Sequence, residues 1–410
     1  LEYAFGAATV AVGWSGYVNS FLQDWGLRIP PQLTASPGTK LAYYHDRWER
    51  LTNVEGMLKA QGLSGDQLSA ALAALPQVSA SFNLVALLAI AIVTTILVIG
   101  IRESANVNTA IVIIKVGVVL TFIGVAAAYL LRHPDVASTN WATFVPANQG
   151  EYGKFGISGI ARGAAVVFFA YIGFDAVSTA AQESRNPQRD MPIGILGSLA
   201  ICTVLYILVS GLLTAVVPYS ALNVPDPVAV GVDATGVRWG SFLVKVGAIA
   251  GLGSVMLVML LGQSRIFFSM SCDGLLPQWA GKVHPRFRTP YISSIAVGIF
   301  VATFAALVPI HILGELVSIG TLLAFVIVCA GILVLRHRHP QMARPFQTPW
   351  VPVVPIGGIL VSLYMMLSLP LDTWLRLIVW LVIGMCIYFG YSRRHSRVGL
   401  ASSPAAAKGD

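Results

Sequence analysis

Charged residues are scarce in this chain: Asp, Glu, Lys and Arg together make up only 11% of its 410 residues. Hydrophobic residues make up 56%, and the mean hydropathy is +0.75. The apolar residues come in blocks of roughly 20, the length that crosses a bilayer as a helix. A soluble domain of this size has too little interior to bury so many apolar side chains. The scarcity of charge therefore argues against a soluble fold and predicts an all-α membrane protein.

Cysteine and recognisable catalytic motifs are also rare or lacking. The four cysteines, Cys202, Cys272, Cys329 and Cys386, lie far apart without CxxC or Cys/His spacing, so we expect packing residues rather than disulfides. The histidines and acids form no metal-ligand pattern. No GxSxG, HExxH or Walker-type loop occurs, which argues against an enzyme or an ATP-driven pump. We expect no catalytic residues, no metal and no cofactor.

Ten apolar segments are predicted to span the membrane as helices, with no evident contribution from strands. Together they define a transmembrane domain over residues 1–391, followed by a tail over 392–410. Their expected ranges are 1–23, 82–101, 109–131, 158–181, 193–217, 242–270, 290–309, 312–335, 353–370 and 372–391.

Basic residues predict the orientation of this stack. With Leu1 on the cytoplasmic side, the inner segments carry 14 Lys and Arg residues, whereas the short outer loops carry three. Segment 24–81 carries five more, but long loops escape the positive-inside rule. The net charge of +8 is thus explained by topology, and no basic block interleaved with aromatic residues indicates nucleic-acid binding. The C-terminal tail should be cytoplasmic.

Segment 24–81 is the one place where extramembrane structure is expected. Proline and glycine mark turns near its start, and the stretch from Tyr43 to Leu75 could contain two short helices separated near Gly62 to Gly65. We interpret this segment as an external loop insertion.

The span 158–181 contains residues that disfavour a continuous helix. Gly173 has weak helix propensity, and Asp175 can cap a new half-helix that starts near Ala176. Non-helical backbone at membrane depth persists only where protein or a watery cavity satisfies its polar groups. The helix ends at such a break suit the carboxylate and ammonium groups of an amino acid. The alternative is that Gly173 only permits tight helix packing and Asp175 pairs with a neighbour.

Lys115 lies about 9 Å into the span 109–131 at 1.5 Å per residue. An ammonium at this depth usually faces a polar interior, and Lys115 could alternate between charged and neutral states as a proton-coupling group. The alternative is that its long side chain snorkels to the nearby surface. Glu2, also embedded among apolar residues, could line a cavity, pair with Lys115 or lie at the rim. Snorkelling is also expected for the charged residues nearer span ends, Arg162, Lys245, Glu315 and Arg376.

Four long motifs follow one another along the chain: 1–17 (LEYAFGAATVAVGWSGY), 102–115, 168–192 (FFAYIGFDAVSTAAQESRNPQRDMP) and 263–277 (QSRIFFSMSCDGLLP). In this order, and over nearly the whole chain, they resemble the cationic amino acid transporter family of the amino acid, polyamine and organocation superfamily. The resemblance implies a five-plus-five inverted repeat followed by two further helices, with solute held between the broken first and sixth helices. The chain begins at what resembles the third helix. About ten of twelve helices are therefore expected, without counterparts of the first two.

The resemblance also implies a solute site. Phe169 is expected to be an aromatic gate, with Ala170, Ile172 and Gly173 around the ligand. Tyr3 matches a third-helix position that faces the cavity, as does its neighbour Glu2.

The resemblance also bears on the roles of two further side chains. Lys115 matches a fifth-helix lysine that takes the place of the sodium site in related sodium-driven transporters, which favours proton coupling. Met259 falls where the family tunes side-chain volume, and a bulky Met should favour smaller or less extended side chains than a Ser would.

These inferences predict a secondary active transporter that takes up amino acids by proton symport through alternating access. Met259 and the compact length favour a neutral over a cationic substrate. An amino acid exchanger, a sodium-coupled carrier and an inactive or sensor fragment remain alternatives. The expected partners are an amino acid, protons and the lipid bilayer, and the expected location is a bacterial plasma (inner) membrane. The sequence does not indicate an oligomeric state.

Overall fold

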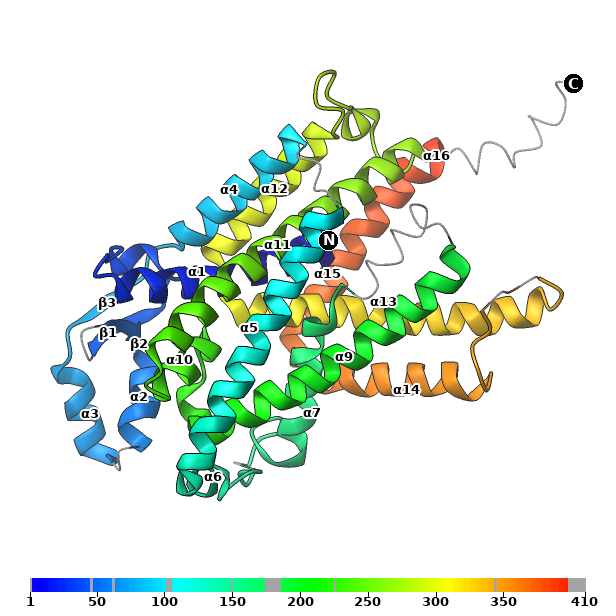
Figure 1. The fold of residues 1–410 in the computed structure, drawn as a ribbon. Coiled ribbons are helices and arrows are strands. Elements are labelled where there is room, and N and C mark those ends of the chain that lie inside the picture. Colours follow the sequence, from blue (N-terminus) through cyan, green and yellow to red (C-terminus); the bar gives the residue numbers. More distant parts are fainter. Residues whose placement is uncertain are drawn as a thin grey trace, which may run out of the picture.

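Helices dominate the structure, a computed structural model, and the predicted all-α class is confirmed (Figure 1). The structure describes residues 2–44, 47–60, 63–100, 105–148, 150–173, 186–224, 226–342, 344 and 346–396.

Helix α1 (Glu2–Asp24) lies at the centre of the helix bundle. It packs against α11 (Arg238–Cys272) and α13 (Ile310–Arg338), and small residues such as Ala7, Ala8 and Ala11 are fully buried on it. Small side chains let helix backbones approach closely, which is how membrane helices gain packing energy. Phe5 provides bulk in the same N-terminal half of this helix, where its ring meets Phe300 edge-on at 5.6 Å between centroids.

The remaining long helices surround this centre. Among the residues that the structure describes, five helical segments are long and apolar enough to cross a membrane. They are α5 (Ala105–Arg132), α9 (Pro187–Val216), α11, α13, and the segment that runs from α15 (Leu371–Ile387) through the π-helical turn η6 (Tyr388–Ser392) into α16 (Arg393–His395). Shorter apolar helices are α4 (Leu84–Ile99), α7 (Gly156–Val167), α12 (Tyr291–Leu307) and α14 (Val353–Leu367). Every range predicted from residue 82 onward overlaps one of these helices.

Helix pairs that are distant in sequence lie side by side. Helix α4 runs along α12, and α13 runs along α14 (Figure 1). Asn83 fixes the start of α4, because its side-chain oxygen accepts the amide hydrogen of Ala86 at 3.0 Å and its amide nitrogen donates to Ser15 of α1 at 2.8 Å. Gly100, at φ 74°, ends the helix in the left-handed conformation.

The outer surface of the bundle is apolar, as lipid requires. Large side chains such as Ile113, Ile299 and Leu371 are exposed by 66%, 65% and 86%. A protein surrounded by water would bury most such residues. Together with the long apolar helices, this surface supports an integral, multi-pass membrane protein.

Within the described part of the chain, the prediction of no strands is wrong in the insertion, residues 24–81. Strands β1 (Lys40–Tyr44), β2 (Arg47–Arg50) and β3 (Gln77–Ser79) form an antiparallel sheet in the order β2-β1-β3. The two expected short helices are present as α2 (Leu51–Ala60) and α3 (Gly65–Ala74). They cover a small core around Val54, which is fully buried. The insertion is thus a folded unit at one side of the bundle (Figure 1).

Short helical turns connect these elements. They are η1 (Pro31–Leu33), α6 (Pro134–Trp141), η2 (Phe168–Tyr171), η4 (Tyr219–Ala221), α10 (Pro227–Ala234) and η5 (Gln278–Gly281).

Candidate functional site

The interruption predicted in the span 158–181 is present at Ile172 and Gly173. Helix α7 ends at Val167 and tightens into the 3₁₀ turn η2, whose last hydrogen bond joins the amide of Ile172 to the carbonyl of Phe169 at 2.9 Å. Ile172 then leaves helical geometry, with ψ 136°, and Gly173 has φ 112°. This φ is strained for residues with a Cβ, so glycine suits the position. The proposed cap Asp175 lies outside the described residues.

Two side chains satisfy backbone groups around η2. The hydroxyl of Ser318 on α13 donates to the carbonyl of Val166 at 2.9 Å and accepts the amide hydrogen of Phe169 at 3.2 Å. The hydroxyl of Tyr206 on α9 donates to the carbonyl of Ala170 at 2.8 Å. Irregular backbone at membrane depth needs such partners, because lipid offers none. Side chains of the neighbouring helices α13 and α9 therefore stabilise the break.

The break opens onto a cavity of about 170 Å³ between α1 and α11. The structure brings together four predicted site residues here, Tyr3, Ile172, Gly173 and Met259. The described residues that line the cavity are Tyr3, Ile172, Gly173, Val255, Val258, Met259 and Gly262. We call this space the central cavity.

Glycines create room for the two large side chains of the central cavity. A Cβ placed on Gly6 would lie 3.0 Å from the sulfur of Met259, so the methionine occupies space that a larger side chain at position 6 would need. A Cβ on Gly262 would lie 3.6 Å from the Tyr3 ring. The shape of the cavity thus depends on small residues facing Met259 and Tyr3.

Phe169 and Ala170 precede the cavity-lining residue Ile172 in the chain but do not line the central cavity themselves. The Phe169 ring packs on α13, 3.5 Å from where a Cβ of Gly314 would be. Ala170 is held through its carbonyl by Tyr206. Neither belongs to the cavity lining described above, so their predicted ligand contacts and the gate role of Phe169 stay predictions.

Lys115 lines a second, larger cavity of about 280 Å³, here named the Lys115 cavity. Its aliphatic chain lies against α11, with Cγ 3.6 Å from where a Cβ of Gly251 would be. Among the described lining residues, Tyr17 is the only other one whose side chain has a polar atom. Val255 lines both this cavity and the central cavity. The candidate proton-coupling residue and the candidate solute site are therefore neighbours along α11.

Glu2 ties α1 to α13. The hydroxyl of Thr321 on α13 donates to Glu2 Oε1 at 2.6 Å. This hydrogen bond places the carboxyl inside the bundle, next to Tyr3 of the central cavity. Its predicted role in proton coupling stays a prediction.

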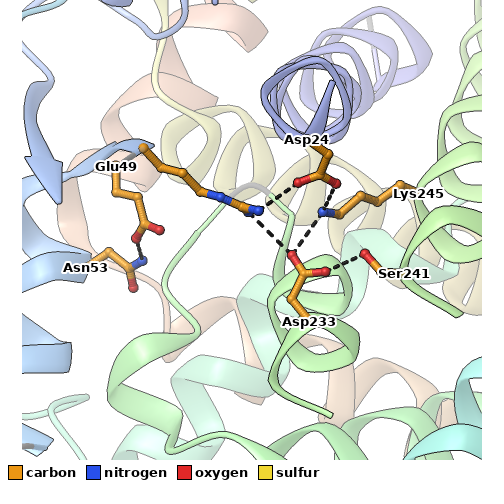
Figure 2. A network of polar contacts seen from close by, with 7 residues as sticks. Asp24, Glu49, Asn53, Asp233, Ser241 and Lys245 are labelled. Atoms are coloured by element: carbon orange, nitrogen blue, oxygen red, sulfur yellow. Dashed lines mark hydrogen bonds and ion pairs between the residues drawn. The ribbon is translucent and has the colours of Figure 1, made fainter. Parts of the chain in front are cut away.

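The prediction that Lys245 snorkels is wrong. Lys245 is fully buried, and its ammonium lies 2.5 Å from Asp24 Oδ2 and 2.9 Å from Asp233 Oδ2 (Figure 2). Arg47 of the insertion contacts the same two carboxylates at 2.7 and 3.5 Å. The hydroxyl of Ser241 donates to the other oxygen of Asp233. This ion-pair network joins α1, β2, α10 and α11.

Glu315 is also paired rather than snorkelling. It is only 8% exposed, accepts a hydrogen bond from Thr373 at 2.7 Å, and lies 3.5 Å from a guanidinium nitrogen of Arg376. These contacts fasten α13 to α15. Burial of a charge is tolerated when such partners surround it.

A sequence model described as "Amino acid permease" matches residues 1–390. The chain belongs to the amino acid permease family. It is therefore a membrane transporter of the APC superfamily and not an enzyme, as the motif resemblance predicted.

Curated relatives from bacteria and plants are similar over much of the chain. Branched-chain amino acid permease BcaP of Bacillus subtilis (strain 168) is 41% identical over 97% of this chain and 75% of its own length. The methylthioribose transporter of the same organism is 40% identical over the same shares. Cationic amino acid transporter 4, vacuolar, of Arabidopsis thaliana is 41% identical over 62% of this chain and 41% of its own length.

Proposed function

We propose that this permease takes up neutral amino acids by proton symport through alternating access. The observation that carries the proposal is the central cavity, where interrupted backbone at Ile172 and Gly173 faces apolar walls. Main-chain groups that leave a helix can hydrogen bond the ammonium and carboxylate groups common to all amino acids. The side chain would then lie toward Val255, Val258 and Met259.

The chemistry of the central cavity favours an uncharged side chain. Among its described lining residues there is no Asp or Glu to pair with a lysine or arginine side chain. Burying a cation without such a partner is costly. The name of the BcaP relative, a branched-chain amino acid permease, agrees with an aliphatic substrate.

Proton coupling is proposed for Lys115. Lys115 lies inside a predicted span and lines a largely apolar cavity, and ionisable residues at such depth often mark ion or proton pathways. Val255 lines both the Lys115 cavity and the central cavity, so the two sites are adjacent. Protonation and solute binding would bias the same inward/outward equilibrium, provided that each has different affinities for the two states.

We propose the plasma membrane of a bacterium as the location, with the C-terminus in the cytoplasm. The Bacillus relatives support the first part and the distribution of Lys and Arg supports the second. The insertion would then lie outside the cell.

A second candidate substrate is methylthioribose. It is favoured by the relative with that name, whose identity to this chain nearly equals that of BcaP. Like a neutral amino acid, it combines polar groups with an apolar end, which suits the same cavity. An exchanger or a sodium-coupled carrier also remains a mechanistic alternative.

Uptake by purified full-length protein in proteoliposomes tests the proposal. We expect radiolabelled leucine, isoleucine or valine to accumulate when an inward proton gradient is applied, and lysine and arginine to compete poorly. Accumulation driven only by a sodium gradient would indicate a sodium-coupled carrier. Accumulation driven only by amino acid inside the vesicles would indicate an exchanger. Competition by methylthioribose but by no amino acid would assign the second substrate.

Replacing Met259 by Ser should change the preference among substrates. The shorter side chain enlarges the central cavity beside Gly6 and adds a hydroxyl, so longer or cationic amino acids should compete about 10-fold better relative to valine. Inhibition constants against valine uptake measure this.

The matched control is Met256→Ser on the same helix. Met256 is buried but does not line the central cavity, so the same side chain is lost from the core without altering the site. An unchanged competition profile in Met259→Ser, or the same change in Met256→Ser, would place Met259 outside the specificity pocket.

A further inference from the structure

A third cavity, of about 90 Å³, lies between the insertion, the end of α1 and α10, beside the ion-pair network. A single buried water needs roughly 10–15 Å³ by the same kind of measure, so this space can hold several waters or a small solute. Polar side chains dominate its wall. Those that matter here are Gln23, Glu49, Arg50, Asn53, Asp226 and Asp233. We call this space the insertion cavity.

Asn53, which lines the insertion cavity, has a buried polar atom without a hydrogen-bond partner among the described residues. The residue is fully buried, and its amide nitrogen donates to Glu49 Oε2 at 2.7 Å (Figure 2). Its amide oxygen Oδ1 has no hydrogen-bond partner within the described part of the chain. A buried oxygen without a donor is costly, and native proteins rarely leave one so. A hydrogen-bond donor that reached this oxygen would satisfy it.

The charges around the insertion cavity are mixed in sign. Arg47 already pairs with Asp24 and Asp233. Arg50 and Asp226 also line the cavity, and they are close enough to interact electrostatically. An occupant that carries both a positive and a negative group would therefore meet complementary charges on this wall, whereas a simple anion or cation would meet like charge as well.

We propose that the insertion cavity is an accessory binding site for a small zwitterionic amino acid. Asn53 Oδ1 and Asp226 would accept hydrogen bonds from its ammonium group, and Arg50 would bind its carboxylate. The choice of an amino acid rests on the proposed function. Because the cavity is about half as large as the central cavity, glycine and alanine fit it better than leucine. On the expected topology, this site meets solutes on the external side.

Binding stoichiometry tests the accessory site. Equilibrium dialysis of the full-length protein in detergent with radiolabelled L-alanine should give two bound molecules per chain. Asn53→Leu, which removes the amide but keeps the side-chain volume, should reduce this to one. Arg50→Gln should have the same effect while leaving Asn53 in place. Agreement between the two variants argues against a folding defect as the cause in either one. Lys59→Ala changes an exposed residue of the same helix α2 that pairs with Glu55, and it should leave two.

A central-cavity variant separates this proposal from the proposed function. Met259→Trp should fill the central cavity and leave one alanine, bound at the insertion cavity. One alanine in the unmodified protein, unaffected by Asn53→Leu and lost in Met259→Trp, would overturn the accessory site and leave the function intact. One alanine that is lost in Asn53→Leu and kept in Met259→Trp would support the accessory site and contradict the central one. No bound alanine in any variant would overturn both, with water filling the insertion cavity.

Binding at the insertion cavity should strengthen as the pH rises through about 6. Enclosure of its carboxyl raises the pKa of Asp226 to about 6, and the Glu49 carboxylate adds to this, while the Lys245 ammonium and a hydrogen bond from Ser20 oppose it. Tyr17 and Arg50 also face this carboxyl. Below its pKa Asp226 is protonated and bears no charge to attract the ligand's ammonium.

The alanine affinity of Met259→Trp, in which only the accessory site is open, should therefore rise towards about 10-fold per pH unit below 6 and level off above it. Adding Asp226→Asn should flatten this profile. A profile that is already flat between pH 5 and 7 with Asp226 in place would overturn the proposed contact.

Discussion

Lys115→Ala should abolish accumulation of amino acid driven by a proton gradient while leaving binding of the amino acid in place. The variant removes the only ammonium among the described residues of the Lys115 cavity, and with it the proposed proton carrier. Without coupling, the ratio of internal to external substrate should fall to about one, the value for passive equilibration. Uptake into proteoliposomes with an imposed proton gradient measures this ratio.

Exchange distinguishes lost coupling from lost folding in this variant. Among the described lining residues, the central cavity shares only Val255 with the Lys115 cavity, so exchange of labelled for unlabelled substrate should persist in Lys115→Ala. Val118→Ala provides a matched control, because it also removes side-chain volume from the Lys115 cavity but no charge. Normal accumulation with unchanged pH dependence in Lys115→Ala would remove the coupling role and favour the snorkelling alternative.

Much of the fold could be predicted because the signals are local. An apolar block long enough to span a bilayer identifies a helix wherever its neighbours lie, and α4 and α12 coincide with their predicted ranges to within about three residues at each end. The interruption at Ile172 and Gly173 was readable for a similar reason, since a glycine followed by an acid is unusual inside a span. The strands of the insertion were missed because they are short, and β1 finds its partner β3 more than 30 residues along the chain.

The site could be predicted only where family motifs or local breaks mark it. Tyr3 and Met259 lie more than 250 residues apart, and no periodicity in the sequence predicts that both line one cavity. Asn53 and Arg50 gave no signal at all, because their importance comes from burial and from the residues that the insertion places around them. Such contacts are set by tertiary packing, which a single sequence does not encode in any short pattern.

Lys245 shows the same limit for a charged residue. Its position near one end of a long apolar helix was consistent with snorkelling, which needs no partner. The partners Asp24 and Asp233 come from the end of α1 and from α10. Because the ammonium is fully enclosed, its charge depends on nearby carboxylates, namely the two that it contacts and Asp226, with which it also interacts electrostatically. Removal of this ammonium should therefore lower the stability of the protein, because it breaks these ion pairs.

Lys245→Met should destabilise the protein by about 2–4 kcal/mol. The replacement has a similar length and no charge, so the loss comes mainly from two carboxylates that lose their ammonium partner. Arg47 still contacts both, and Ser241 still donates to Asp233. The loss is expected to be smaller than for a fully buried pair, because the side chains of Asp24 and Asp233 are 28% and 30% exposed and water screens part of the effect. Chaotrope or thermal unfolding in detergent measures it.

A double-mutant cycle shows whether charge pairing or packing causes this loss. If pairing is the cause, Lys245→Met combined with Asp233→Asn should be more stable than the sum of the single effects predicts, since the second change removes a carboxylate left without its ammonium. Arg47→Gln is the exposed counterpart, because Arg47 contacts the same acids but is 38% exposed, and it should cost about 1 kcal/mol or less. Strict additivity in the cycle, or an Arg47→Gln effect as large as that of Lys245→Met, would contradict a buried ammonium as the centre of this network. The network holds the insertion against α1, α10 and α11. Loss of the Lys245 ion pairs should therefore also weaken the packing of the residues that line the insertion cavity.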